Sequence, residues 1–232
     1  MKLTAGIRVK NGEPWAEECL YQLSEVVDEI VVLDNGSTDA TPSICRACSK
    51  VTRLLRWEKS FFHEGIDRNV MLAMIKDTEP DWILIMDIDE VFEAHAAAVL
   101  PELLNQDECA VWGFRMLHFW RDKRRYRIDG KWGEETGRHI HPRLFRNQPG
   151  IYFPPQKIHG AHILGLQGQA AVAESLYIRH YGYSFWEQTV AKYELYRRED
   201  PDGDYEHLID EQGLQLVDYD AIAGRDGAGA NR

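Results

Sequence analysis

The stretch that decides the fold is WILIMDIDE, residues 82–90, in which an apolar run ends in three carboxylates. A continuously apolar run is typical of a strand that other elements cover on both faces. In an extended strand end, residues i and i+2 point to the same side, so Asp87 and Asp89 are expected to face one point. Paired carboxylates there suit a hard divalent cation such as Mg²⁺ or Mn²⁺. The alternative is a polar strand end with exposed acids, and Glu90 either supports the pair or caps the next segment.

A second strand-like run, IVVLDNGSTDAT at residues 30–41, also stops at an acid, Asp34. Asp34 either holds a ligand or bonds the amides of its own turn, as an aspartate in DNGS commonly does. Residues 37–39 are Ser, Thr and Asp, which favour helix N-caps, so we expect them to cap a helix that reaches about Cys48.

Strands and helices alternate over the first 105 residues. This pattern predicts an α/β fold with a parallel sheet, helices on both faces, and ligands bound outside the carboxyl ends of the strands. Asp34 and the Asp87–Glu90 cluster are both expected at that edge. The expected strands are 3–9, 29–34, 52–57 and 82–87. Four helices are expected: the first begins at Pro14, the second begins after residue 39, and the last two span 64–76 and 94–105.

The pattern changes from residue 108 onward. We therefore expect one domain with an α/β half (1–107), a smaller mixed β/α half (108–220) and a Gly/Ala-rich tail (221–232) that is disordered. A final helix is expected to start at Ser184, with Glu187 completing a capping box. The strands expected in the second half are a hairpin of 109–120 with 126–132, then 141–147 and 175–183.

The composition limits the class of protein. The chain has 232 residues and a formal net charge of −11, which argues against a nonspecific nucleic-acid binder. It enters a strand-like run at once and has no apolar run near the ~18 residues of a membrane span. We therefore expect a reducing, cytoplasmic location. Cys45 and Cys48, in CRAC, are either a metal or redox pair or ordinary helix residues.

Four segments in order resemble inverting nucleotide-sugar glycosyltransferases of family 2, which have the GT-A fold, and a short bacterial or viral member in particular. The likeness is close over residues 1–95 and looser beyond. It implies a Rossmann-like sheet that binds the nucleotide sugar and a second half on the acceptor side. The segments are VKNGEPW (9–15), VDEIVVLDNGSTDAT (27–41), HEGIDRN (63–69) and WILIMDIDE (82–90).

The resemblance assigns roles in donor binding. It implies that Asp34 holds the nucleotide base or ribose, which suits a carboxylate acceptor. Lys10 and Asn11, in the loop after the first strand, are implied to bind the nucleotide sugar. Asp87 and Asp89 match the D-x-D motif that binds the metal and the sugar diphosphate.

Arg68 matches an arginine that reaches the nucleotide in this family. A guanidinium beside a helix N-terminus is a good place for a diphosphate or a base edge. The alternative is a surface salt bridge with Glu64 or Asp67.

The second half holds the remaining candidates. His180, in IRHYGYS, resembles a histidine that completes the metal site in some GT-A enzymes, although a packed core histidine is the alternative. An inverting transferase needs a carboxylate base, and we favour Glu134 or Glu135 over Asp129. The alternative for Glu134 and Glu135 is a solvated acidic loop. Gly160 replaces the Glu of an H-E pair that short relatives carry.

The sequence therefore predicts a metal-dependent transfer, with Mn²⁺ or Mg²⁺, from a nucleoside diphosphate sugar (UDP-linked or similar) to a hydroxyl of a glycan or lipid-linked acceptor. The basic run 121–127 either contacts a phosphate-bearing acceptor or the cytoplasmic membrane face, or is an exposed hairpin tip. Two alternatives stay open: a non-catalytic nucleotide- or sugar-binding relic of the fold, and a sugar-phosphate nucleotidyltransferase. The nucleotidyltransferase is disfavoured because the first loop lacks a glycine run.

Overall fold

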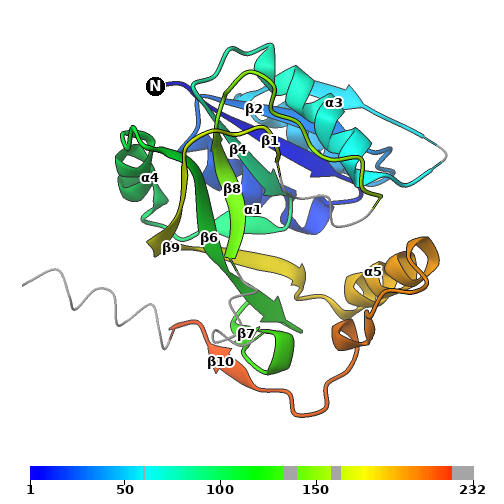
Figure 1. Cartoon of the computed structure of the whole chain (residues 1–232). Helices are drawn as coiled ribbons and strands as arrows, with labels where there is room; N and C mark the ends of the chain where they lie inside the picture. The colour runs from blue at the N-terminus through cyan, green and yellow to red at the C-terminus, as the bar shows by residue number, and fades with distance from the viewer. Residues whose placement is uncertain (60, 133–139, 158–162, 221–232) are drawn as a thin grey trace, which may run out of the picture. The chain divides into compact units, whose positions relative to one another are not determined.

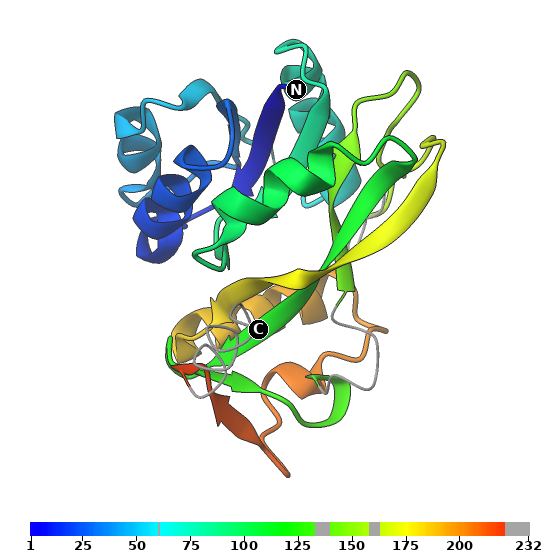
Figure 2. The same cartoon turned by 90° about the vertical axis from the view of Figure 1, so that its left-hand side faces the viewer.

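The computed structural model describes residues 1–59, 61–132, 140–157 and 163–220. The chain forms two compact units, the first of Met1–Arg115 with Ile140–Ile178 and the second of Met116–His139 with Arg179–Arg232. Two long strands, β6 (Cys109–Trp120) and β9 (Gln169–Tyr183), each contribute to both units. They pair with one another, as Figure 2 shows. The expected halves, 1–107 and 108–220, divide the chain differently and stay a prediction.

The first unit is built on a sheet in the order β6-β8-β4-β1-β2-β3. Strands β1 to β4 of this order pair in parallel, and β8 lies antiparallel to both β4 and β6. The expected α/β fold with a mostly parallel sheet is therefore confirmed. The strand bounds are β1 (Leu3–Val9), β2 (Glu29–Asp34), β3 (Val51–Arg56), β4 (Trp82–Asp87) and β8 (Ile140–Arg146).

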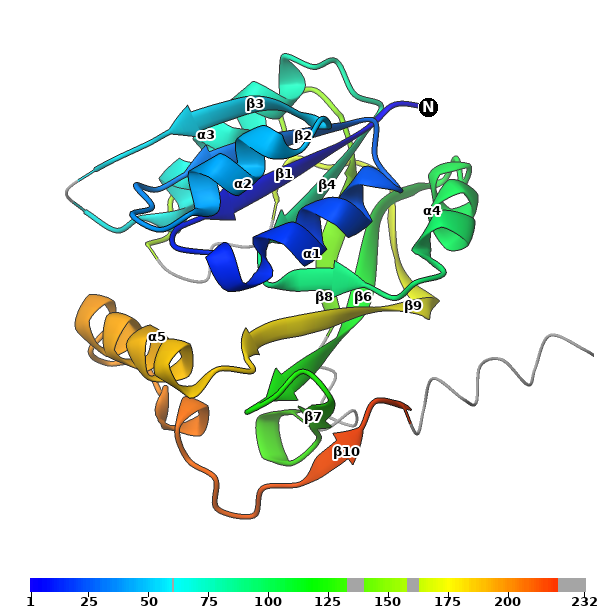
Figure 3. The same ribbon diagram turned by 180° about the vertical axis from the view of Figure 1, so that it is seen from behind.

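Helices cover both faces of the parallel strands. Helix α3 (Glu64–Lys76) lies on one face, and α1 (Glu13–Ser24) and α2 (Thr41–Ala47) lie on the other (Figures 1 and 3). Gly6 of β1 lets α3 pack closely, because a Cβ there would collide with the side chain of Ile75. Helix α4 (Ala96–Leu104) completes the expected set and is slightly shorter than predicted.

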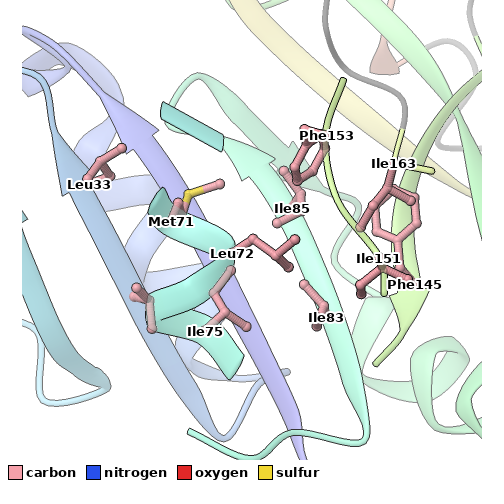
Figure 4. Close-up of a cluster of buried hydrophobic side chains, with 11 residues drawn as sticks. Leu33, Met71, Leu72, Ile75, Ile83, Ile85, Phe145, Ile151, Phe153 and Ile163 are labelled. Carbon is pink, nitrogen blue, oxygen red and sulfur yellow. The ribbon is translucent and has the colours of Figure 1, made fainter. Parts of the chain in front are cut away.

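The core under α3 explains why these segments hold together. Apolar side chains of β2, β4 and α3 meet aromatic and branched residues that follow or belong to β8 (Figure 4). Burial of such side chains is the main favourable contribution to folding. The fully or nearly fully buried members are Val31, Leu33, Met71, Leu72, Ile75, Ile83, Ile85, Phe145, Ile151, Phe153 and Ile163.

One strand of the first unit was not anticipated. Residues Glu90–Phe92 form a short strand, β5, that pairs with β9. Glu90 is consequently a buried strand residue and does not cap the next segment, and of its two expected roles the contact with Asp87 is the one observed.

The second unit differs more from expectation. Of the predicted strand 126–132, only residues 126 and 127 are extended, as part of β7 (Arg125–Arg127). The strand stops there because Trp132 N donates to Asp129 O and closes a 3-10 turn. The predicted capping box is also wrong: α5 (Trp186–Glu199) has Phe185 at its N-cap, and Ser184 Oγ donates to Tyr181 O instead. A short strand, β10 (Leu216–Asp218), pairs with β7 and was missed.

Aromatic residues form the core of this unit. Trp120, Trp132, Tyr183 and Tyr205 are buried together with Leu208.

Across the described part of the chain, no helix is both long and apolar enough to cross a membrane. The predicted tail, 221–232, lies outside the described residues.

Candidate donor-binding site

The strand register brings two of the predicted acids to one edge of the sheet. Strand β1 lies between β2 and β4, with Val9 opposite Asp34 and Arg8 opposite Asp87. With neighbouring strands about 4.8 Å apart, the two acids lie on the order of 10 Å apart across β1. This is the edge where ligands bind in open parallel sheets.

Asp34 is fully buried at the end of β2. Its Oδ1 accepts the amide of Ser37 at 2.9 Å, and its carbonyl accepts the amide of Trp57 at 2.7 Å. Its Oδ2 has no hydrogen-bond partner among the described residues. Asp34 therefore does bond its own turn, and it also keeps one acceptor unused.

Lys10 and Asn11 lie in the exposed loop after β1, as predicted. Asn11 has a φ of 53°, in the left-handed region that asparagine tolerates better than most residues. Its Oδ1 accepts the Thr38 amide at 2.9 Å, and its own amide donates to Ser37 Oγ at 2.8 Å. Asn11 thus joins this loop to the turn that follows Asp34.

Those contacts correct the expected role of residues 37–39. Helix α2 begins at Thr41, with Ala40 as an N-cap that has no side-chain cap. Asp39 does bond the Thr41 amide at 3.1 Å, but its other oxygen accepts the amide of Glu13 in the β1 loop, also at 3.1 Å. Residues 37–39 mainly fasten two loops together at the edge of the sheet.

Arg68 points from α3 towards Asp87 and is only 3% exposed. Its Nη2 lies 3.7 Å from Asp87 Oδ1, and its guanidinium lies 5.7 Å from the ring centre of Phe153. Its Nε and Nη1 have no hydrogen-bond partner in the part of the chain that the structure describes. Burial lowers the pKa of Arg68 and Asp87 opposes this effect, but an arginine remains charged at neutral pH.

The alternative pairing of Arg68 with Glu64 or Asp67 is not what the structure contains. Glu64 accepts from Arg8 at 2.9 Å, and Asp67 pairs with Lys59 at 2.6 Å. Arg68 is therefore left facing the edge of the sheet.

The N-terminus of α3 is closed by the chain itself. The amides of Glu64 and Gly65 donate to the carbonyls of Lys157 and Gln156, both at 3.0 Å, and the amide of Ile66 donates to His63 Nδ1 at 3.3 Å. These three amides are therefore already bonded, and the expected diphosphate contact of Arg68 stays a prediction. Any anion binding here depends on the Arg68 side chain.

Asp87 is held by a second arginine that the sequence reasoning missed. Arg143 Nη2 lies 3.4 Å from Asp87 Oδ2, and Arg143 also donates through both Nε and Nη2 to Glu90. Burial raises the pKa of Asp87, but Arg68 and Arg143 outweigh it and hold that pKa below its usual value. The only sequence signal was a charged residue inside the strand-like HPRLFRN.

The donor set at this edge fits a hard divalent cation. Strand β4 ends at Asp87 and residues 88–89 form a turn, so the alternation expected along an extended strand end does not apply to Asp87 and Asp89. The Asp87 side chain is 31% exposed and Asp89 is partly exposed. Among the described residues, no group of three or more His, Cys, Asp or Glu is arranged to hold a metal. Two carboxylates are nonetheless enough for Mg²⁺, which often takes its remaining ligands from water and substrate phosphates.

His180 belongs to the second unit, whereas Asp87 and Asp89 belong to the first. It is buried, and its Nδ1 lies 3.0 Å from Nδ1 of His118. Its ring also meets Tyr183 edge-on at 5.0 Å. His180 is thus packed in the core, as the alternative expected, and the role of His180 as a metal ligand stays a prediction.

The predicted bases, Glu134 and Glu135, lie outside the described residues, as does Gly160. Asp129 is fully engaged, since it accepts from Arg127 Nε at 2.9 Å and from the Gln215 amide at 2.9 Å. Its carboxylate stabilises a turn.

The basic run 121–127 is partly neutralised within its own unit. Arg121 pairs with Glu211 at 2.7 Å, and Arg125 pairs with Asp122 at 2.7 Å. Arg127 pairs with Asp129 at 2.8 Å. These pairs leave less net charge for an anionic partner than the sequence suggested.

A mostly parallel sheet with acids and an unsatisfied arginine at its carboxyl edge defines a protein of the GT-A class. The chain belongs to glycosyl transferase family 2, whose sequence model matches residues 4–161. S. aureus TarS, solved as residues 1–349, has a similar fold, with a TM-score of 0.55, 18% identity, and coverage of 90% of this chain and 68% of that one. TarS has also been solved with UDP-GlcNAc, again with a TM-score of 0.55.

Two curated relatives are similar to this chain, and one of them is named as a glycosyltransferase. The lipopolysaccharide core biosynthesis glycosyltransferase LpsC of Rhizobium meliloti is 29% identical over 184 residues, which are 77% of this chain and 64% of LpsC. A TPR repeat-containing protein of Synechococcus elongatus is 31% identical over 172 residues, 71% of this chain and 38% of that protein. The chain thus spans between about two fifths and two thirds of the length of these relatives.

Proposed function

We propose that the chain transfers a sugar, with inversion, from a nucleoside diphosphate sugar to a hydroxyl acceptor, with Mn²⁺ or Mg²⁺ bound at Asp87 and Asp89. The observation that carries the proposal is Arg68, a buried guanidinium with two unbonded nitrogens beside an ionised Asp87. Buried donor nitrogens that lack hydrogen-bond partners are costly unless a ligand satisfies them. A diphosphate supplies acceptor oxygens of the matching charge.

The nucleoside is assigned to Asp34. A carboxylate accepts hydrogen bonds from the imide N–H of uracil or from ribose hydroxyls, and Oδ2 of Asp34 is the acceptor that its turn leaves unused. Because Asp34 is fully buried, this assignment requires Oδ2 to become accessible when the nucleotide binds. The complex of TarS with UDP-GlcNAc makes a uridine donor the first to test.

The chemistry of the step follows from charge. The leaving diphosphate gains negative charge in the transition state, and Arg68 is placed to stabilise it. A divalent cation, when bound, adds further neutralisation of the same oxygens. A carboxylate must deprotonate the acceptor hydroxyl, and we assign this role to Glu134 or Glu135.

The acceptor is proposed to be a glycan or lipid-linked saccharide. The relative LpsC is named for lipopolysaccharide core biosynthesis, which supports a saccharide acceptor. Lys123 and Arg124, in the basic run, are the residues we assign to contact with acceptor phosphate or an anionic membrane surface.

Calorimetric titration with UDP, with and without Mn²⁺, tests the proposal. We expect Mn²⁺-dependent binding by the unmodified chain. Arg68→Met should weaken UDP binding roughly 10- to 100-fold, since a hydrogen bond to a charged group contributes about 1.5–3 kcal/mol. Asp89→Ala should remove the Mn²⁺ dependence.

Arg115→Met is the matched control, because Arg115 pairs with the exposed Glu174 and lies outside this network. No binding of UDP or of any other common nucleoside diphosphate, or unchanged binding by Asp89→Ala, would contradict the proposal. Slow release of UDP from a UDP-sugar by the chain alone would argue against a non-catalytic relic.

A further inference from the structure

We infer that Arg143, together with Glu90, is a positioning residue that holds Asp87 in the geometry needed for the cation. The inference rests on the proposed function and deepens it, because it adds residues from two other strands to the D-x-D motif. Arg143 comes from β8 and Glu90 from β5, whereas Asp87 ends β4.

The three residues form a closed ring of contacts. Glu90 Oε2 accepts the backbone amide of Asp87 at 3.0 Å. The same oxygen accepts from Arg143 Nε at 2.9 Å, and Arg143 Nη2 reaches both Glu90 Oε1 and, at 3.4 Å, Asp87 Oδ2. The main chain and the side chain of Asp87 are thus fixed by one pair of charges.

Glu90 and Arg143 are buried, whereas Asp87 is partly exposed to solvent. Glu90 is 1% exposed and Arg143 is 4% exposed, whereas the Asp87 side chain is 31% exposed. Glu90 is committed to Arg143 and to the Asp87 amide, so we assign it neither metal binding nor proton transfer. Asp87 is the member of the ring that a cation in solvent can reach.

The two arginines at Asp87 have different duties. Arg143 faces Oδ2 of Asp87 and Arg68 faces Oδ1, at 3.4 and 3.7 Å. Nε and Nη2 of Arg143 donate to carboxylates of the protein, whereas Nε and Nη1 of Arg68 have no hydrogen-bond partner among the described residues. Arg143 therefore orients the carboxylate, and Arg68 is left to meet the ligand. A buried, hydrogen-bonded supporting group of this kind commonly fixes a metal-binding side chain.

The test uses variants that avoid an unpaired buried charge. Arg143→Met combined with Glu90→Gln removes both members of the pair together. We expect this double variant to fold and to bind UDP without Mn²⁺ as the unmodified chain does. Its Kd for UDP in the presence of Mn²⁺ should rise at least roughly tenfold, so the gain in affinity from Mn²⁺ is lost.

Arg143→Lys keeps the positive charge but loses the two-pronged guanidinium that donates through Nε and Nη2. This variant should therefore show an intermediate gain in UDP affinity from Mn²⁺. Arg146→Met is the matched control on the same strand, because Arg146 bonds the carbonyls of Cys109 and Gln106 and should leave the gain unchanged. Should the double variant fail to fold, Arg143→Lys carries the test through the same ratio of affinities.

The outcomes separate the inference from the proposed function. Failure of the unmodified chain to bind UDP under any condition would overturn both. Mn²⁺-dependent binding by the unmodified chain with the same dependence in a folded double variant, or in Arg143→Lys where the double variant does not fold, would overturn the role of Arg143 alone.

Discussion

Asp34 shows how one carboxylate can serve both the fold and a ligand. Its Oδ1 closes the turn through the Ser37 amide, and its Oδ2 is buried and unbonded among the described residues. The sequence offered these two roles as alternatives. They use different oxygens, so they are compatible once the buried Oδ2 becomes accessible to the nucleotide. Substitutions that change one oxygen at a time can separate them.

Asp34→Asn should keep the turn and lose the ligand contact. The amide oxygen of Asn still accepts from Ser37, but the NH₂ group that replaces Oδ2 donates and cannot accept an imide N–H. We expect near-unmodified thermal stability and UDP binding weakened roughly tenfold or more, measured by calorimetry.

Asp34→Ala is the comparison, since it also removes the turn bond and should lower stability by about 1 kcal/mol or more. Unmodified UDP affinity in Asp34→Asn would restrict Asp34 to its turn.

At the level of elements, helix α3 is tied to the segment that follows β8. Asn69 donates to Phe153 O at 2.8 Å and accepts the Phe153 amide at 2.9 Å. Gly65 lies so close to this segment that a Cβ would collide with Pro154 O and come within 3.0 Å of Gln156 N. The same contacts place the Phe153 ring beside Arg68.

Gly65→Ala should therefore destabilise the chain. In an open helix this change would stabilise by about 0.5–1 kcal/mol, but here the added methyl meets backbone and should cost about 1–3 kcal/mol. Urea unfolding measures the difference. Ala73→Gly, at an exposed position of α3, is the control for helix propensity alone and should cost about 1 kcal/mol. A more stable Gly65→Ala chain would show that this segment is not packed as described.

For the whole molecule, the excess of acids makes stability depend on pH. Several carboxylates have a pKa below the usual value, and Asp129 is an example. Burial raises the pKa of Asp129, but hydrogen bonds from Arg127 and the Gln215 amide lower it by more. A group with a lowered folded pKa stabilises the fold above its unfolded pKa, near 4, and loses that contribution as pH falls through the folded pKa.

We expect the urea midpoint to fall as pH decreases from about 5 to 3, with net proton uptake on unfolding. Asp129→Asn should lower the midpoint at pH 7 and make the fall shallower, because one of the titrating groups is gone. Arg127 is then left without its carboxylate, so the loss at pH 7 should be about 1–3 kcal/mol. An unchanged pH profile in Asp129→Asn would contradict this account.

Much of the first unit could be predicted because its signals are local. The run that ends at Asp87 and the run that ends at Asp34 gave both strands with their observed bounds. The second unit was less predictable, since β7 and β10 are three residues each and depend on pairing with one another. Strands of that length carry no periodicity that distinguishes them from turns.

The sequence by itself determined the alternation of strands and helices and the placement of Asp34 and Asp87 at one edge, because hydrophobic periodicity and strand direction suffice for both. Only the tertiary structure decided which charges meet there. Arg143 and Glu90 are 53 positions apart, and no local pattern pairs them. Burial makes each of these side chains require a partner, and the packing of β4, β5 and β8 selects which partner it is.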